Sequence, residues 1–154
     1  MDPLAVADYR AATEAFLAAT ALAEPHDLDR RPAGGWSARQ VIHHVADAEA
    51  QSYVRLRRLL AEPGSLIQGY DEAAWAACPT LGYEELAVEH ALALIRALRA
   101  ASADLLERLS SEDLALEGQH SEAGAYSVAT WLDTYTRHPR EHAAQLAAAL
   151  AAGR

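Results

Sequence analysis

The amino-acid sequence predicts an all-α fold, a four-helix bundle, on three observations. Apolar residues make up 51% of its 154 residues, and the many alanines and leucines among them favour helix over strand. Four segments place apolar residues three and four positions apart, which gives a helix one apolar face. Three of these segments begin at a residue type that commonly caps helices. We expect a single domain that covers residues 1–154.

The first expected helix follows Asp2, which suits the N-cap, and Pro3, which suits the first helical position. It should end before the Glu24-Pro25 pair. Residues 26–35 contain a proline and a glycine pair, which are typical of an irregular connection. The expected buried face of this helix consists of Val6, Tyr9, Thr13, Phe16, Leu17 and Thr20.

The second expected helix begins after a capping box, in which Ser37 and Gln40 satisfy each other's backbone donors. Trp36 precedes the box as a hydrophobic staple, and residues 62–64 (EPG) should end the helix. His44 falls on the apolar stripe and should be buried, whereas His43, about 100° round the helix, should lie nearer to solvent. The other stripe positions are Val41, Val45, Ala48, Ser52, Leu56 and Leu59.

Two more helices complete the expected bundle. Residues 65–80 form a long connection with one short helical turn, and residues 83 to about 109 form the third helix. Residues 112–124 are polar and turn-rich, so we expect a second connection there. Ser127 should cap the fourth helix. Its continuous inward stripe consists of Val128, Trp131, Leu132, Tyr135, His138, His142, Gln145, Leu146 and Ala149.

His138 and His142 are four residues apart, which leaves their imidazoles about 40° apart on one helix face. Such a pair is how a helix presents two nitrogen ligands to a divalent metal. The letters H-x-x-E-H also match the inverted zinc-protease motif. That interpretation fails, because such proteases take a further carboxylate from downstream and residues 143–154 contain no Asp or Glu. A third ligand must therefore lie upstream, and His44 is the candidate in a bundle core.

Each candidate also has a structural interpretation without metal. A single inward histidine such as His44 is more often a hydrogen-bonded core residue than a ligand. His138 and His142 could line a polar patch, although burying two imidazoles together without a shared partner costs desolvation. Glu141 lies about 100° from His142 and should be a solvated charge. Asp47, one turn after His44, either orients an imidazole or faces water.

Two motifs resemble the DinB/YfiT-like superfamily, residues 35–47 (GWSARQVIHHVAD) and residues 138–146 (HPREHAAQL). Residues 52–55 (SYVR) and 70–76 (YDEAAWA) extend the likeness toward the YfiT-type metal-dependent hydrolases and bacillithiol transferases. The resemblance implies a four-helix bundle that holds zinc or nickel on His44, His138 and His142, often as a homodimer. The chain departs from the pattern at Gln40, where many members have Glu, and at Pro139, which removes a backbone donor inside the ligand turn.

The expected activity follows from three nitrogen ligands, which leave a tetrahedral metal one open position. That position could activate water for hydrolysis or bind a low-molecular-weight thiol for transfer to an electrophile, and the resemblance favours the thiol. The alternative is a metal-binding stress or sensor protein without turnover. Asp47, Glu141 and Tyr135 all remain candidates for a general base.

Composition limits the partners and the location. Thirteen basic and 22 acidic residues give a formal net charge of −9, which disfavours nucleic acid. The single cysteine excludes an internal disulfide and fits a reducing compartment. The first residues lack a signal peptide, and no apolar run is long enough to cross a bilayer. We therefore expect a cytoplasmic protein that acts on a small molecule.

Overall fold

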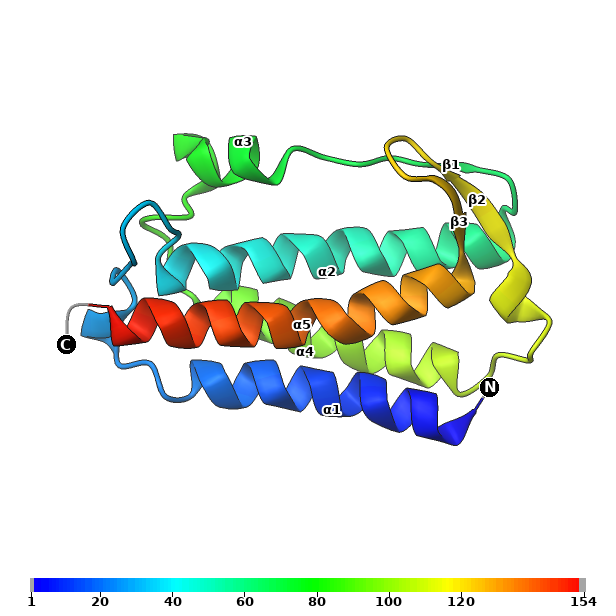
Figure 1. Ribbon diagram of the computed structural model, residues 1–154, viewed down its shortest axis with the longest axis horizontal. Helices are drawn as coiled ribbons and strands as arrows, with labels where there is room; N and C mark the ends of the chain where they lie inside the picture. The colour runs from blue at the N-terminus through cyan, green and yellow to red at the C-terminus, as the bar shows by residue number, and fades with distance from the viewer. Residues whose placement is uncertain (1, 153–154) are drawn as a thin grey trace.

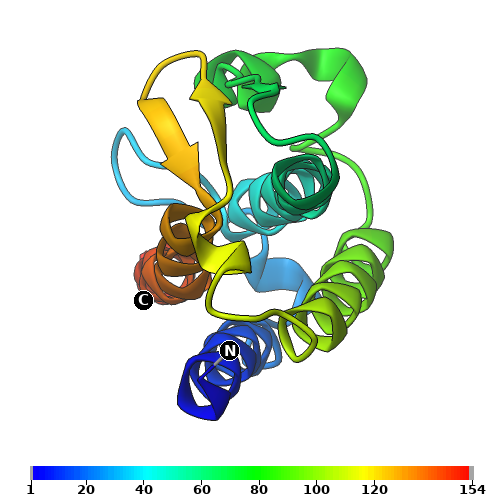
Figure 2. The same ribbon diagram turned by 90° about the vertical axis from the view of Figure 1, so that its right-hand side faces the viewer.

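Four long helices form the bundle in a computed structural model that describes residues 2–152. They are α1 (Pro3–Thr20), α2 (Ala38–Ala61), α4 (Glu89–Leu106) and α5 (Val128–Ala151). Viewed along the helices, α1 and α2 lie at opposite corners, and each contacts both α4 and α5 (Figure 2). The predicted four-helix bundle is confirmed.

The direction of the helices explains the long connection between the second and third of them. The colours in Figure 1 show that α2 and α4 run in the same direction, opposite to α1 and α5. The chain must therefore travel back along the whole bundle between α2 and α4. This return segment carries β1 (Leu66–Ile67), α3 (Glu72–Ala77) and a 3-10 turn η2 (Pro79–Leu81). It forms a layer over α2, which we call the roof, residues 65–81.

Three predicted caps hold the helix starts. An Oδ1 atom of Asp2 accepts a hydrogen bond from the backbone N–H of Leu4 at 2.9 Å. Ser37 and Gln40 form the capping box, with both reciprocal bonds present. Ser127 accepts from the backbone N–H of Thr130 at 3.1 Å. Each of these helices therefore begins at the residue that its cap predicts.

The third helix is shorter than predicted. It begins at Glu89 instead of residue 83 and ends at Leu106. Residues 82–86 form a tight turn, in which the backbone N–H groups of Glu85 and Leu86 both donate to the carbonyl of Gly82, whose φ is 67°. The prediction failed because the apolar spacing continues through this turn, while the hydrogen bonds of the helix begin only where the N–H of Leu92 donates to the carbonyl of Val88 at 2.9 Å.

A three-stranded sheet was not predicted at all. The expected connection at residues 112–124 contains a 3-10 turn η3 (Asp113–Ala115) and strand β2 (Glu117–His120), which pairs antiparallel with β3 (Gly124–Ser127). Strand β1 joins β2 in parallel, with Ile67 opposite His120. A Cβ atom at Gly118 would lie 2.5 Å from the carbonyl oxygen of Ser65, so only glycine permits this close pairing. The sheet thereby fastens the roof to the second connection.

Buried apolar residues form two clusters, and a polar layer separates them. One cluster gathers around Phe16, Ile42 and Leu146, and the other around Tyr9, Leu56 and Trp131. The buried polar residues between these clusters come from α1, α2 and α4, and α5 adds the half-buried His138 and His142. The buried ones are Thr13, His44, Glu49, Ser52, Arg99 and Ser102. None of the described helices combines the length and hydrophobicity needed to span a membrane. The candidate site lies in this polar layer.

Candidate metal centre

The three predicted histidines come together between α2 and α5. The Nε2 atoms of His44 and His142 lie 3.2 Å apart, and those of His142 and His138 lie 3.0 Å apart. One ring nitrogen from each residue lies within 4.8 Å of the others. His44 is fully buried, while His138 and His142 are half-buried. The i, i+4 spacing on α5 and the stripe position on α2 therefore aim three nitrogens at one point.

The spacing of these nitrogens fits a divalent cation. A tetrahedral zinc ion with bonds of about 2.0–2.1 Å separates its nitrogen ligands by about 3.3 Å. The two observed separations of 3.2 and 3.0 Å are close to that value. Three imidazoles without a carboxylate in the cluster are also a ligand set that zinc and nickel accept.

Burial keeps the three imidazoles neutral. It lowers the pKa of His44 to about 3, and the charge of a protonated His142 adds to the effect. It lowers the pKa of His138 to about 2, with further contributions from His142 and His44. The pKa of His142 is lowered by burial, against opposing effects of Gln145 and Glu141. Near neutral pH each ring therefore has a lone pair available for a cation.

Gln145 fixes the tautomer of one ligand. Its Oε1 atom lies 2.7 Å from Nδ1 of His142, and because an amide oxygen only accepts, Nδ1 must carry the proton. The lone pair of His142 therefore sits on Nε2, which faces the centre. The Nδ1 atoms of His44 and His138 are buried and have no hydrogen-bond partner within residues 2–152. The sequence analysis predicted Gln145 only as part of the inward stripe. Its role could have been predicted from its position, because an amide three residues after a ligand lies one turn further along the same face and can accept a hydrogen bond from that ligand.

Glu72 is a functional candidate that the sequence interpretation missed. It lies in the first turn of α3, and its Oε2 atom is 3.9 Å from Nε2 of His44. Its side chain remains 53% exposed, yet partial burial raises the pKa of the carboxyl, while the charge of Arg55 acts in the opposite direction. The roof therefore brings a carboxylate from the connection to the edge of the histidine cluster.

The three residues considered as a general base lie elsewhere or are already engaged. Asp47 accepts a hydrogen bond from the Tyr83 hydroxyl at 2.5 Å and so neither orients an imidazole nor faces water alone. Glu141 is exposed and pairs with Arg137, as expected of a solvated charge. The Tyr135 hydroxyl accepts from Arg55 at 2.9 Å, and burial raises its pKa. None of them approaches the cluster as Glu72 does.

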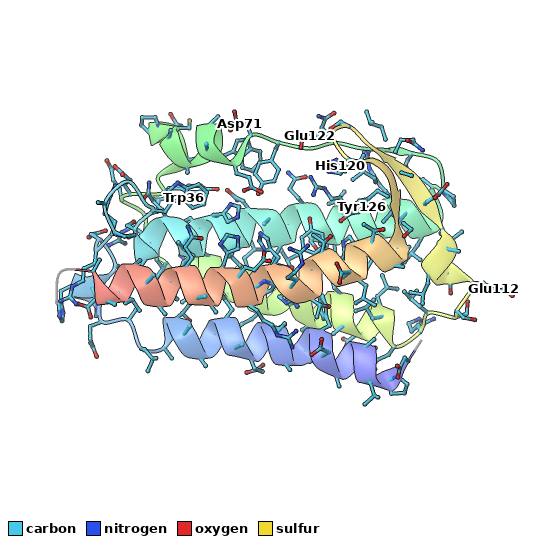
Figure 3. The ribbon with its side chains drawn as sticks, viewed as in Figure 1. Trp36, Asp71, Glu112, His120, Glu122 and Tyr126 are labelled. Carbon is cyan, nitrogen blue, oxygen red and sulfur yellow. The ribbon has the colours of Figure 1, made fainter. Side chains whose placement is uncertain are left out.

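A cavity of about 290 Å³ lies beside the cluster, between α3 and the start of α2. Trp36, Ala73, Ala76 and Tyr83 are among the residues that line it. The Trp36 ring also packs against the His44 ring, with centroids 5.0 Å apart. Figure 3 shows Trp36 at this end of α2, below the roof. Trp36 therefore both lines this cavity and contacts His44, while the three histidines are not among the residues that line it.

A family model described as DinB superfamily matches residues 8–146. The chain belongs to the DinB superfamily. Among solved structures, this DinB domain is similar to YfiT from Bacillus subtilis, with a TM-score of 0.83 and 26% identity over 92% of this chain and 81% of YfiT. YfiT is described as a probable metal-dependent hydrolase with an unusual four-helix bundle topology. The resemblance predicted from the two histidine motifs is confirmed.

Two relatives of this DinB-superfamily chain are more similar in sequence. A protein of Oceanobacillus iheyensis is 37% identical over 113 residues, which are 73% of this chain and 64% of the relative. A protein of Bacillus cereus is 34% identical over 126 residues, 78% of this chain and 71% of the relative. Both carry the name "Putative metal-dependent hydrolase". The chain thus spans less than two thirds of the Oceanobacillus protein.

Proposed function

We propose that this protein is a metal-dependent enzyme that holds zinc or nickel on His44, His138 and His142. The observation that carries the proposal is the convergence of three neutral ring nitrogens within 4.8 Å of one another. A divalent cation on three nitrogens supplies an open coordination position and Lewis acidity for a small molecule bound there. The names of the relatives support the same class of activity.

Glu72 is placed to act as the general base. Its carboxylate lies beside the cluster, 3.9 Å from Nε2 of His44, and partial burial raises its pKa toward neutral pH. In hydrolysis, Glu72 accepts a proton from water as the water oxygen bonds to the carbonyl carbon of an ester or amide. The proton then passes to the leaving oxygen or nitrogen as its bond to carbon breaks. The description of YfiT makes hydrolysis the first reaction to test.

Transfer of a low-molecular-weight thiol is the second candidate reaction, and the resemblance to bacillithiol transferases supports it. Here Glu72 accepts the thiol proton, and the sulfur forms a bond to an electrophilic carbon as a leaving anion departs. The same residues serve both reactions, so the substrate and not the site distinguishes them. The remaining alternative is a stress or sensor protein that binds metal without turnover.

One set of measurements separates these functions. The full chain, loaded with zinc or with nickel, is assayed with p-nitrophenyl acetate, and with cysteine plus 1-chloro-2,4-dinitrobenzene. We expect about one ion per chain, metal-dependent turnover in one assay, and loss of turnover in a folded His44→Ala variant. A lower melting temperature on chelation with no turnover in either assay would favour the non-catalytic alternative. Absence of bound metal would overturn the proposed site.

Partners and location stay predictions. The net charge of −9 disfavours nucleic acid, and the resemblance favours a homodimer. Sedimentation velocity of the purified chain checks the dimer, since a single species of 16.6 kDa would contradict it. Fractionation of cells that express the tagged chain checks the expected cytoplasmic location.

A further inference from the structure

Besides the Nδ1 atoms of His44 and His138, the buried polar atoms without a hydrogen-bond partner within residues 2–152 include two that lie between α2 and the roof. They are Nε of Arg55 on α2 and the hydroxyl oxygen of Tyr70 in the roof. A buried donor without a partner costs free energy, so such an atom in a native structure calls for an explanation. Two of them on facing elements beside one site point to a shared partner from outside the chain.

Arg55 has unused donors and forms no ion pair within residues 2–152, although its charge lowers the pKa of Glu72. Its Nη1 atom donates to the Tyr135 hydroxyl at 2.9 Å, and its Nη2 atom donates to the carbonyl of Gln68 at 2.7 Å. Both acceptors are neutral. Among the described residues no carboxylate forms an ion pair with this guanidinium. Since arginine has five N–H donors, Nε–H and others remain free to bind an anion.

Tyr70 offers a second donor. Its ring packs against Trp75, with centroids 4.4 Å apart, which fixes the side chain under the roof. Burial raises the pKa of the hydroxyl, as do the charges of Glu72 and Asp47, while the charge of Arg55 lowers it. The hydroxyl is therefore protonated and lies within electrostatic reach of Arg55.

Both residues stand next to the metal centre. The Tyr135 ring, which Arg55 contacts, lies 6.0 Å from the ring of His138. Tyr70 is two residues before Glu72, whose carboxylate is 3.9 Å from His44. The backbone N–H of Gly69 donates to Ser121 Oγ at 2.9 Å, which holds this part of the roof against the β2–β3 turn. Figure 3 shows Asp71 of the roof, and His120 and Glu122 of the β2–β3 hairpin, above α2.

We propose that Arg55 and Tyr70 form a subsite that binds a carboxylate group of the small-molecule substrate beside the three histidines. The proposal rests on the proposed function for the identity of the site and goes beyond it by naming the substrate class. A carboxylate is favoured over a neutral carbonyl because the guanidinium forms no ion pair among the described residues, although the charge of Glu72 acts on it from a distance, and because a guanidinium matches a carboxylate in bidentate geometry. The substrate then carries its negative charge on the side of the reacting group that faces β2 and β3.

A purely structural role predicts different behaviour. If Arg55 only braces Tyr135 and Gln68, its replacement destabilises the roof without changing the preference between charged and neutral ligands. If the Tyr70 hydroxyl has no ligand, its removal leaves binding unchanged. Tyr70→Phe removes a hydroxyl that has no protein partner, so it should leave the melting temperature unchanged or higher.

The test compares benzoate with its neutral counterpart benzamide by isothermal titration on the full chain. We expect wild type to bind benzoate at least about tenfold more tightly than benzamide, and Arg55→Met to lose that preference. Tyr70→Phe should weaken benzoate about threefold to tenfold without loss of stability. Arg57→Met is the matched control, since Arg57 lies on the same helix with its guanidinium over the Tyr53 ring, and it should leave the preference intact.

The titrations are run on both zinc-loaded and chelator-treated protein. A preference for benzoate that appears only with zinc, and that survives Arg55→Met, would assign the carboxylate to the metal and overturn the subsite. Equal binding of benzoate and benzamide by wild type would overturn it as well. Tyr70→Phe keeps the test decisive should Arg55→Met fold poorly. If no metal binds, the proposed function fails, while the chelator-treated titration still measures the subsite.

Discussion

Arg99 donates a hydrogen bond to the backbone carbonyl of Tyr135 at 2.9 Å, and this carbonyl is the acceptor that Pro139 leaves without its helical partner. In a regular helix the N–H of residue 139 would fill that role, but proline has none. The same Nη1 atom donates to Glu49 at 2.8 Å, and both side chains are 1% exposed. A buried ion pair on α2 and α4 thus completes the backbone turn that carries His138.

The first prediction is that Arg99 and Pro139 are energetically coupled. Pro139→Ala restores a backbone donor for Tyr135, so the loss of Arg99 should matter less in that background. We expect Arg99→Met to cost about 3–5 kcal/mol in wild type, because it leaves Glu49 buried and unpaired. In the Pro139→Ala background the cost should be about 1 kcal/mol smaller. Urea denaturation of the four proteins gives the coupling, and strictly additive free energies of unfolding would refute it.

The sequence predicted those parts of the molecule that depend on local spacing. Caps at Asp2, Ser37 and Ser127 fixed three helix starts. The i, i+4 spacing of His138 and His142 and the stripe position of His44 placed three imidazoles at one point. Caps and helical periodicity decide the helix starts and the inward faces, because both act within one helix. His44 was predicted as the third ligand because residues 143–154 contain no Asp or Glu and because of the resemblance to the DinB/YfiT-like superfamily.

The long connection that forms the roof and its short helical turn were predicted, but the path of the roof over the histidines was not. Glu72 reaches His44 only because β1 pairs with β2, about 50 residues further along the chain. These strands have two to four residues and little apolar alternation, so they give no local signal. Arg99 was missed for a related reason, since its partners Glu49 and Tyr135 come from two other helices.

The second prediction concerns Gln145. Because its Oε1 atom accepts from Nδ1–H of His142, Gln145→Leu should lower the affinity for zinc by about 10–100-fold. Gln145→Glu keeps an acceptor at this position and should retain most of the affinity. Competition with a chromophoric chelator measures both variants, and circular dichroism verifies their fold. An unchanged affinity in Gln145→Leu would show that the tautomer of His142 is set without this contact.

The third prediction is the pH dependence of the stability of chelator-treated protein. Burial lowers the pKa of His44 to about 3 and of His138 to about 2, against about 6.5 in an unfolded chain. Below pH 6.5 the unfolded state therefore binds protons that the folded state does not. The free energy of unfolding decreases as the pH is lowered. The limiting slope is about 1.4 kcal/mol per pH unit for each histidine.

This slope is best measured by urea denaturation between pH 7 and pH 5, where ordinary carboxylates stay ionised. His44→Gln removes one of the titrating groups and should reduce the slope. A slope that is the same in wild type and His44→Gln would mean that His44 takes up a proton in the folded state.

The fourth prediction tests Glu72 as the general base. Glu72→Gln removes the proton acceptor but no proposed ligand, so metal content should stay at the wild-type level while kcat falls about 10²–10⁴-fold. Partial burial raises the pKa of Glu72. As the pH is lowered, the wild-type kcat/KM should therefore begin to decline at a higher pH than it would with an ordinary glutamate as the base. The base must be ionised to act, so this acid limb should disappear in Glu72→Gln. Glu85→Gln, at the rim of the neighbouring cavity, is the matched control. A Glu72→Gln enzyme with full metal and more than half of the wild-type kcat would place the base elsewhere.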